Sequence, residues 1–561
     1  MEKVILRLPK GLYAAAIIAL LVCNISFAAS LYYTGGDWDD PTSWSPEGVP
    51  DSSDSAYIAN YDTAGSLELS DSAEFSTMNG YIGKDADKDG SVIVDGAGSS
   101  WDVINKLVVG DEGYGELTVS NGATISSDTG LIGGYIETDL RSGFPIVIVP
   151  DTRPNGTGLV NIDGENSCWT VGSTLLVGEY GDGELNITNG GHVSGDLVRI
   201  DGGYVELGDA VFAQGEGSVT VDGEGSSLTA NDMLTVGTTQ NGTGTLNVTN
   251  GGEVACDRAY VGGFGLTYSG TGKIIVKNSG SSLTVNKELY LTGKSDSDNS
   301  FAHLDSLIVA KGASVSCGNA TIASSKVTVK GVGTTWDVNG EIDIRNGDLV
   351  IKNSGLVQSD QLTLSNRDTW YDDGVLVYLD GGTIKTNTMT NLCAIGAFSF
   401  TSGDLHTDNY IGKLEINGGT LCPGNSSKLM NITEKFKMSS GTIQIEIAGL
   451  TRGVEYSSID TETHFNLDGG NLDVELADGF ELDYNQLFTI IDVGGDLAGT
   501  GQFDGLGQDS LVGSFNGVDL FISYTAGDGN DIALYTAIPE PGTLLLVGVG
   551  GLILRRAKLR L

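Results

Sequence analysis

The sequence predicts an all-β fold, a right-handed parallel β-helix built from many short stacked strands. Three observations favour it. The chain has 83 Gly but only 10 Pro among 561 residues, a composition that fits many tight turns and excludes collagen. Two short motifs recur along the chain, which indicates a repeat architecture. Within the motifs apolar and polar residues alternate, as in strands with one buried face.

The first motif reads as an apolar residue, a glycine-containing turn and then a Trp or Leu. Copies occur at residues 94–101, 162–169, 221–228, 276–283 and 329–336. The spacing between copies is uneven. A propeller, the rival architecture, needs blades of about four antiparallel strands, whereas a solenoid accommodates unequal repeats as loops. The spacing therefore favours the β-helix.

The second motif has the form Leu-x-Val or Leu-x-Ile followed by Asn-Gly, at residues 115–122, 183–190 and 244–251. Asn-Gly supplies the positive φ that ends a strand in a tight turn. Stacking of such turns would place their asparagines along one corner as a structural ladder, with Trp101, Trp169 and Trp336 along another line. The ladder residues are Asn121, Asn189, Asn250 and Asn353.

Together the two motifs resemble the repeat shared by PEP-CTERM proteins and type V autotransporters, over roughly residues 79–385. The resemblance implies parallel β-helix rungs. Residues 29–78, with Trp38 and Trp44, resemble the N-terminal cap of such proteins, and residues 441–537 their last rungs and C-terminal cap. The β-helix repeats are accordingly expected at 79–440.

Both ends of the chain have the composition of targeting segments. Residues 1–28 combine basic residues, an apolar stretch and small residues at the cleavage positions, which is typical of a secretory signal peptide. Cleavage is expected between Ala28 and Ala29. The other end, residues 538–561, has a Pro-Glu-Pro motif, an apolar stretch and a basic tail. The parts that define this motif are Pro539, Glu540, Pro541, Arg555 and Arg556.

This C-terminal segment resembles the PEP-CTERM sorting signal, with a hydrophobic sorting helix. The resemblance implies an exosortase-type processing enzyme as partner, transient insertion into the inner membrane and release to the outer surface or extracellular matrix. The apolar stretch is short for a stable span of about 20 residues. A retained anchor is the alternative, so the sequence leaves open whether the tail is cleaved or kept.

The chain is strongly acidic, with a formal net charge of −43. Such a surface disfavours nucleic acid and anionic lipid as partners. Five cysteines follow the signal segment, at 168, 256, 317, 393 and 422, without any C-x-x-C pair. Their disulfide state is open, and small buried side chains are expected. Cys256 and Cys317 follow the same motif and are expected to stack near each other.

Few residues suggest chemistry. Asp85, Asp87 and Asp89 open like a calcium loop, but the twelfth position is Gly96 instead of a bidentate Glu. They are weak metal candidates, and no cofactor is expected. We interpret the chain as an exported non-catalytic protein of the cell surface or matrix, adhesive or associated with extracellular polysaccharide. The alternative is a carbohydrate-active β-helix enzyme, a polysaccharide lyase or hydrolase.

Overall fold

The computed structural model describes residues 28–59, 65–134, 156–179, 181–202, 206–207, 210–211, 215–239, 242–263, 270–293, 305–365, 376–393, 397–425 and 428–537. These residues form strands and turns, with a single 3-10 turn, η1 (Pro41–Ser43). None of them belongs to a helix long and apolar enough to cross a membrane. The structure confirms the all-β prediction.

The chain divides into two compact units, with the boundary inside strands β16 and β17. The strands up to that boundary are β1 (Ser30–Tyr33), β2 (Trp44–Ser45), β3 (Ser55–Ile58), β4 (Gly65–Leu69), β5 (Glu74–Ile82), β6 (Gly90–Asp95), β7 (Ser100–Val109), β8 (Tyr114–Ser120), β9 (Thr124–Ile132), β10 (Thr157–Asp163), β11 (Cys168–Val177), β12 (Asp182–Thr188), β13 (His192–Ile200), β14 (Glu206–Leu207), β15 (Ala210–Val211), β16 (Glu216–Asp222) and β17 (Ser227–Val236).

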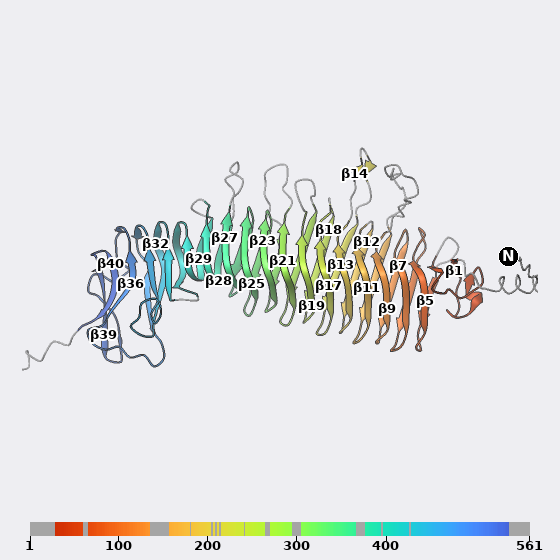
Figure 1. Cartoon of the computed structure of the whole chain (residues 1–561), viewed down its shortest axis with the longest axis horizontal. Helices are drawn as coiled ribbons and strands as arrows, with labels where there is room; N and C mark the ends of the chain where they lie inside the picture. Colours follow the sequence, from red (N-terminus) through yellow and green to blue (C-terminus); the bar gives the residue numbers. More distant parts are fainter. Residues whose placement is uncertain are drawn as a thin grey trace, which may run out of the picture. The chain divides into compact units, whose positions relative to one another are not determined.

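In the first unit each strand from β3 to β11 pairs in parallel with the next strand but one, whereas β1–β2 and β14–β15 pair antiparallel. The even series runs β4–β6–β8–β10–β12 and the odd series β3–β5–β7–β9–β11–β13. Figure 1 shows the odd strands β5 to β13 lying side by side in order. One turn of the solenoid thus contains two strands that contribute to two separate columns. This is a solenoid of the β-helix kind, as the repeats predicted.

Alternation within each strand builds the core. Leu117 and Val119 of β8 point inward, in register with Val160 and Ile162 of β10, and all four are fully buried. The residues between them face outward. A single strand could not bury its apolar face alone. Each stacked neighbour removes part of that face from water, which stabilises the fold by about 25 cal/mol per Å² of apolar surface buried. The stacking therefore explains why the apolar positions repeat.

The N-terminal end of this core is covered by aromatic side chains. Trp44 is buried and its ring stacks on Phe75 at 5.9 Å between centroids, and Phe75 in turn contacts Trp101 at 5.8 Å. The Trp44 indole donates a hydrogen bond to the Trp38 carbonyl. Strands β1 and β3 already pair in parallel, so the parallel pairing includes residues 29–78, the expected N-terminal cap and entry segment.

The second unit repeats the arrangement. Its further strands are β18 (Thr243–Thr249), β19 (Glu253–Val261), β20 (Thr271–Lys277), β21 (Ser282–Thr292), β22 (Asp305–Ala310), β23 (Ser314–Ala323), β24 (Lys326–Lys330), β25 (Thr335–Arg345), β26 (Asp348–Lys352), β27 (Leu356–Ser365), β28 (Leu376–Asn391), β29 (Phe398–Ile411), β30 (Leu414–Pro423), β31 (Leu429–Ile432), β32 (Phe436–Ile447), β33 (Ser458–Thr461), β34 (Phe465–Leu467), β35 (Asn471–Leu476), β36 (Leu487–Val493), β37 (Leu497–Gly499), β38 (Leu511–Phe515), β39 (Val518–Ala526) and β40 (Asp531–Thr536).

Pairing in the second unit changes along the chain. Parallel pairs run from β18–β20 to β34–β37, and the long strand β28 pairs with both β26 and β27. The last strands pair antiparallel, as β36–β40, β38–β39 and β39–β40. Antiparallel strands after a parallel stack cover an edge that would otherwise be open to another chain. The segment 441–537 therefore contains parallel rungs followed by an antiparallel end.

Candidate functional site

The four asparagines of the expected ladder lie in turns with left-handed backbone. Asn121, Asn189, Asn250 and Asn353 have φ values of 54°, 53°, 54° and 52°. Asparagine tolerates this region because its short amide bonds locally, whereas β-branched residues are strained there. Each turn ends one strand and starts the next.

The side chains of these turns bond mainly to aspartate, not to one another. The Asn121 amide donates to Asp95 Oδ1 at 2.7 Å, and the Asn189 amide donates to Asp163 Oδ1 at 2.6 Å. Asn250 donates likewise to Asp222, and only Asn278 donates to another asparagine of the corner, Asn250. The expected asparagine ladder is thus corrected to an alternation of Asp and Asn. The first motif supplies the acceptor and the second the donor.

A hydroxyl one residue before Asn121, Asn189 and Asn250 also donates to the same aspartate. Ser120 donates to Asp95 Oδ1 at 2.5 Å, and Thr188 donates to Asp163 Oδ1 at the same distance. These side-chain bonds from Ser120 and Asn121 lower the pKa of Asp95 below its usual range. The carboxylate is therefore the form that this corner stabilises.

A second set of bonds runs in the opposite direction. A buried serine or threonine lies just before the strand that follows each turn of the first motif. Its hydroxyl accepts a hydrogen bond from a glycine N–H in the turn of a neighbouring rung. The pairs are Ser167 with Gly122 (3.0 Å), Ser226 with Gly190 (3.0 Å), Ser281 with Gly251 (3.0 Å) and Thr334 with Gly312 (2.8 Å). Each buried hydroxyl satisfies a backbone donor that would otherwise cost about 1–3 kcal/mol.

The tryptophans of the first motif share a comparable contact. Trp101 Nε1 donates to Thr77 Oγ1 at 3.0 Å, and Trp169 Nε1 donates to Ser127 Oγ at 3.1 Å. Trp101 and Trp169 stand in one column with Ile125 between them. At Trp336 the register puts Cys317 where Thr77 and Ser127 stand, so its indole N–H meets a thiol sulfur, a weak acceptor, in place of a hydroxyl oxygen.

The mature cysteines are free thiols in the structure. Cys256 and Cys317 share a column, but Val285 stands between them, so the expected close stacking is wrong. They lie two rungs apart, which at about 4.8 Å per rung exceeds the reach of a disulfide. Burial raises the pKa of Cys256, Cys317 and Cys422 to about 12, so these thiols are poor nucleophiles.

The three weak metal candidates differ in how exposed their side chains are. Asp85 is buried, whereas Asp87 and Asp89 are exposed. The adjacent Lys84 places its ammonium 3.1 Å from Asp111, which is not one of the three candidates, and the charge of Asp85 also acts on this lysine. Among the residues that the structure describes, no group of three or more His, Cys, Asp or Glu is arranged to hold a metal ion.

The processing residues are placed only in part. Pro539, Glu540, Pro541, Arg555 and Arg556 lie outside the described residues, as do residues 1–27 of the expected signal peptide. Ala28 is exposed, and the backbone of Ala29 already joins the fold through its N–H to Asp54 Oδ1 at 2.8 Å.

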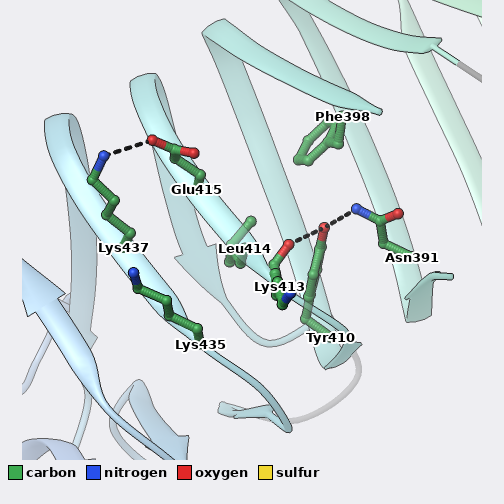
Figure 2. A pocket seen from close by; sticks show the side chains of 8 residues that line it. All are labelled: Asn391, Phe398, Tyr410, Lys413, Leu414, Glu415, Lys435 and Lys437. Carbon is green, nitrogen blue, oxygen red and sulfur yellow. Dashed lines mark hydrogen bonds and ion pairs between the residues drawn. The ribbon is translucent and has the colours of Figure 1, made fainter. Parts of the chain in front are cut away.

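Figure 2 shows a small cationic pocket in the second unit, lined by Asn391, Phe398, Tyr410, Lys413, Leu414, Glu415, Lys435 and Lys437. Lys437 pairs with Glu415 at 2.8 Å. The buried Tyr410 hydroxyl donates to the Lys413 carbonyl and accepts from Asn391. The pocket measures about 40 Å³, against roughly 300–1,000 Å³ for small-molecule sites, so it has room for one or two waters.

A larger hollow in the first unit, about 860 Å³, is acidic. It is lined by Tyr33, Gly36, Asp37, Trp38, Asp39, Ser66, Glu68, Ser70, Asp71, Ser72, Ala73 and Glu74. Five of these side chains are carboxylates, so the hollow disfavours anionic ligands.

Lysines replace the aspartates at the same corner farther along the chain. The fourth and fifth copies of the first motif have Lys277 and Lys330 where the first three copies have aspartate. Lys277 pairs in register with Ala310, Ala310 with Lys330, and Lys330 with Lys352. Lys311 follows Ala310 and donates its backbone N–H to the Lys330 carbonyl. We name Lys277, Lys311, Lys330 and Lys352 the lysine corner.

Sequence reasoning missed the aspartate acceptors and the lysine corner. The signal was present in the motif copies, because the residue after the first apolar position changes from Asp to Lys between the third and fourth copies. The structural effect of this change from Asp to Lys depends on which residues share a column. The columns are known only once the register of the strands is known.

Comparison with known proteins gives distant relatives. The chain is 28% identical over 206 residues to the uncharacterized protein YuaQ of Escherichia coli (strain K12), a match that covers 34% of this chain and 14% of YuaQ. It is 26% identical over 204 residues to the uncharacterized lipoprotein YdeK of the same organism, covering 31% and 13%. The chain thus spans only a small part of both. No family model and no solved structure matches.

Proposed function

We propose that the chain is an exported, non-catalytic repeat protein of the cell surface or extracellular matrix, associated with extracellular polysaccharide. The observation that carries the proposal is the interlocked corner. The polar residues of both repeat motifs, such as Asp163, Asn189 and Ser226, bond one rung to the next. The most regular polar groups of the chain thus serve the assembly of a scaffold.

The proposal includes the finer features of the architecture and the route of export. It describes the solenoid as a right-handed parallel β-helix that follows a cleaved signal peptide and precedes a hydrophobic sorting helix. The PEP-CTERM-like tail would be processed by an exosortase-type enzyme after transient insertion in the inner membrane. A relative, YdeK, is named a lipoprotein, which supports an envelope location for this chain.

Cell fractionation tests the location. The wild-type chain is expected in the outer-surface or matrix fraction, with an intact mass that ends near Pro541. A variant with Pro539, Glu540 and Pro541 replaced by alanine is expected to stay in the membrane fraction at the mass that retains the tail. A wild-type protein that keeps residues 542–561, or that stays inside the cell, would contradict the proposal.

A separate assay tests the absence of catalysis. The purified protein is incubated with pectin, alginate and glucans, with and without calcium, and the products are analysed for unsaturated or reducing ends. No turnover above the protein-free control is expected. Turnover of any of these polymers would favour a lyase or hydrolase instead.

A further inference from the structure

The lysine corner differs from its surroundings in charge. Its four turns, residues 277–280, 310–313, 330–334 and 352–355, contain no Asp or Glu, although the chain has 73 acidic residues. The corresponding turns of the first motif copies contain Asp95, Asp163 and Asp222. Four positive charges thus gather along one corner of an otherwise acidic protein.

Among the described residues these lysines have no ion pairs. The lysines and arginines of the second unit that do pair are found elsewhere, as with Lys287 and Asp257 or Lys437 and Glu415. In the part of the chain that the structure describes, Lys277, Lys311, Lys330 and Lys352 have no carboxylate within salt-bridge distance.

Like charges on neighbouring rungs repel one another. Lys330 and Lys352 are register partners on adjacent strands, and strands in a sheet lie about 4.8 Å apart. Like charges directly opposite in a sheet are destabilising. An external anion that lies along the corner would relieve this repulsion.

An apolar column runs beside the lysines on the same outward face. Ile275 pairs with Ile308, Ile308 with Thr328, Thr328 with Val350 and Val350 with Tyr378. Ile275, Thr328 and Val350 each lie two residues before a lysine of the corner, and Ile308 lies two residues before Ala310, so the two columns share one face of the sheet. Thr328 and Ala310 are buried on this face. Tyr378 is 37% exposed. The strip therefore offers an aliphatic and aromatic surface with a cationic border.

We propose that this strip binds a linear polysaccharide that has carboxylate groups, with its anionic groups along the lysine corner and the apolar faces of its sugar rings on the Ile275–Tyr378 column. Lysine rather than arginine lines the corner, which suits single carboxylates more than bidentate phosphate contacts. No aromatic platform alternates with the lysines in the described turns, as base stacking would need. The inference rests on the proposed association with polysaccharide and specifies its ligand class.

The acidity of the whole chain does not prevent this binding. Charges farther apart than about 8 Å are largely screened at physiological salt. The four lysines lie within a few rungs of each other, and their local field is strongest from β20 to β24, because Asp380 stands one rung beyond Lys352 and Asp348 lies near Tyr378. Binding should weaken as salt rises, because the contacts are ionic.

The test uses the full chain and polygalacturonate as probe, with titration calorimetry at low and physiological salt. The variant Lys330→Gln with Lys352→Gln keeps the side-chain stems and removes two charges. It is expected to bind about thirtyfold more weakly, from the contribution of two lysines near a polyanion. The matched control, Lys413→Gln with Lys435→Gln, removes two other unpaired lysines near the small pocket and should bind like wild type.

Several outcomes would overturn the inference. They are wild-type protein that does not bind polygalacturonate, equal loss in both double variants, equally tight binding of neutral dextran, and binding of duplex DNA in place of the polyuronate. Unchanged thermal unfolding of both variants verifies that the fold is intact. If the protein is found in the matrix but does not bind polygalacturonate, the ligand is refuted and the proposed location stands. If the protein binds tightly but is retained in the cell, the proposed location is refuted and the ligand stands.

Discussion

Asn250 donates a hydrogen bond of 2.6 Å from its side-chain amide to Oδ1 of Asp222, 28 residues earlier in the chain. The two residues end neighbouring strands, β18 and β16. Asn250 has two functions here, since its backbone adopts a φ of 54° and its amide joins two rungs. The turn and the contact between rungs thus depend on one side chain.

Replacing Asn250 should separate these two functions. Asn250→Val places a β-branched residue at positive φ and removes the amide, and we expect a loss of about 1–3 kcal/mol in the free energy of unfolding. Asn250→Gly keeps the backbone conformation and loses only the side-chain bonds to Asp222 and from Asn278, so it should be less destabilised than Asn250→Val by the strain that valine adds. Urea unfolding of both variants measures the difference. Equal midpoints for valine and glycine would show that φ at this turn is unimportant.

Acid should weaken the corner through Asp95. Hydrogen bonds from Ser120 and Asn121 lower the pKa of Asp95 in the folded state. Its carboxylate therefore stabilises the fold above the unfolded pKa of about 4, and this contribution is lost as pH falls through the lower folded pKa. The effect is small because Asp95 is near the surface and screened.

The measurement compares wild type with Asp95→Asn, whose amide oxygen can still accept both bonds but does not titrate. Urea midpoints are followed from neutral to strongly acidic pH. The advantage of wild type over the variant should shrink at the acid end. A difference that stays constant with pH would mean that Asp95 is not stabilised in its charged form.

The sequence was sufficient to predict strands, turns and a stacked fold, because these depend on local features. Examples are the period-two alternation at Leu117 and Val119 and the Asn-Gly turn at residue 121. The bond between Asp163 and Asn189 joins residues 26 apart, and the column that contains Lys277, Lys330 and Lys352 depends on inserted loops of unequal length. No local pattern specifies which residues become register partners across such insertions. The hydrogen-bond partners at this corner, and the change from aspartate to lysine along it, could therefore be identified only from the structure.

Replacing Cys317 by serine should change the stability of the fold differently from replacing Cys256 by serine. Cys317→Ser offers Trp336 an oxygen acceptor like that of Ser127 for Trp169. On the rung after Cys256 the same position is Leu283, so Cys256→Ser buries a hydroxyl without an indole donor. We expect Cys317→Ser to be the more stable variant by about 1 kcal/mol. Urea unfolding of both serine variants measures this, and equal stability would argue against an indole–hydroxyl bond at Trp336.

Gly130 provides the space for an indole ring. A Cβ added at Gly130 would lie 2.5 Å from Trp169 Cζ2, and the same distance separates a Cβ at Gly80 from Trp101 Cζ2. Both glycines lie in strands where φ is not positive, so the requirement is steric and not conformational. Overfilling a packed core of this kind costs about 1–3 kcal/mol.

Gly130→Ala should therefore destabilise the first unit by that amount and alter the fluorescence of the buried tryptophans. Gly172→Ala is the matched control in neighbouring strand β11, because its nearest new contact is Asp128 Oδ1 at an ordinary 3.4 Å. At such a site alanine is neutral or slightly stabilising, since it restricts the unfolded chain. If both alanine variants unfold at the same urea concentration, the indole of Trp169 does not require the glycine, and the repeated Gly–Trp contact would need another cause.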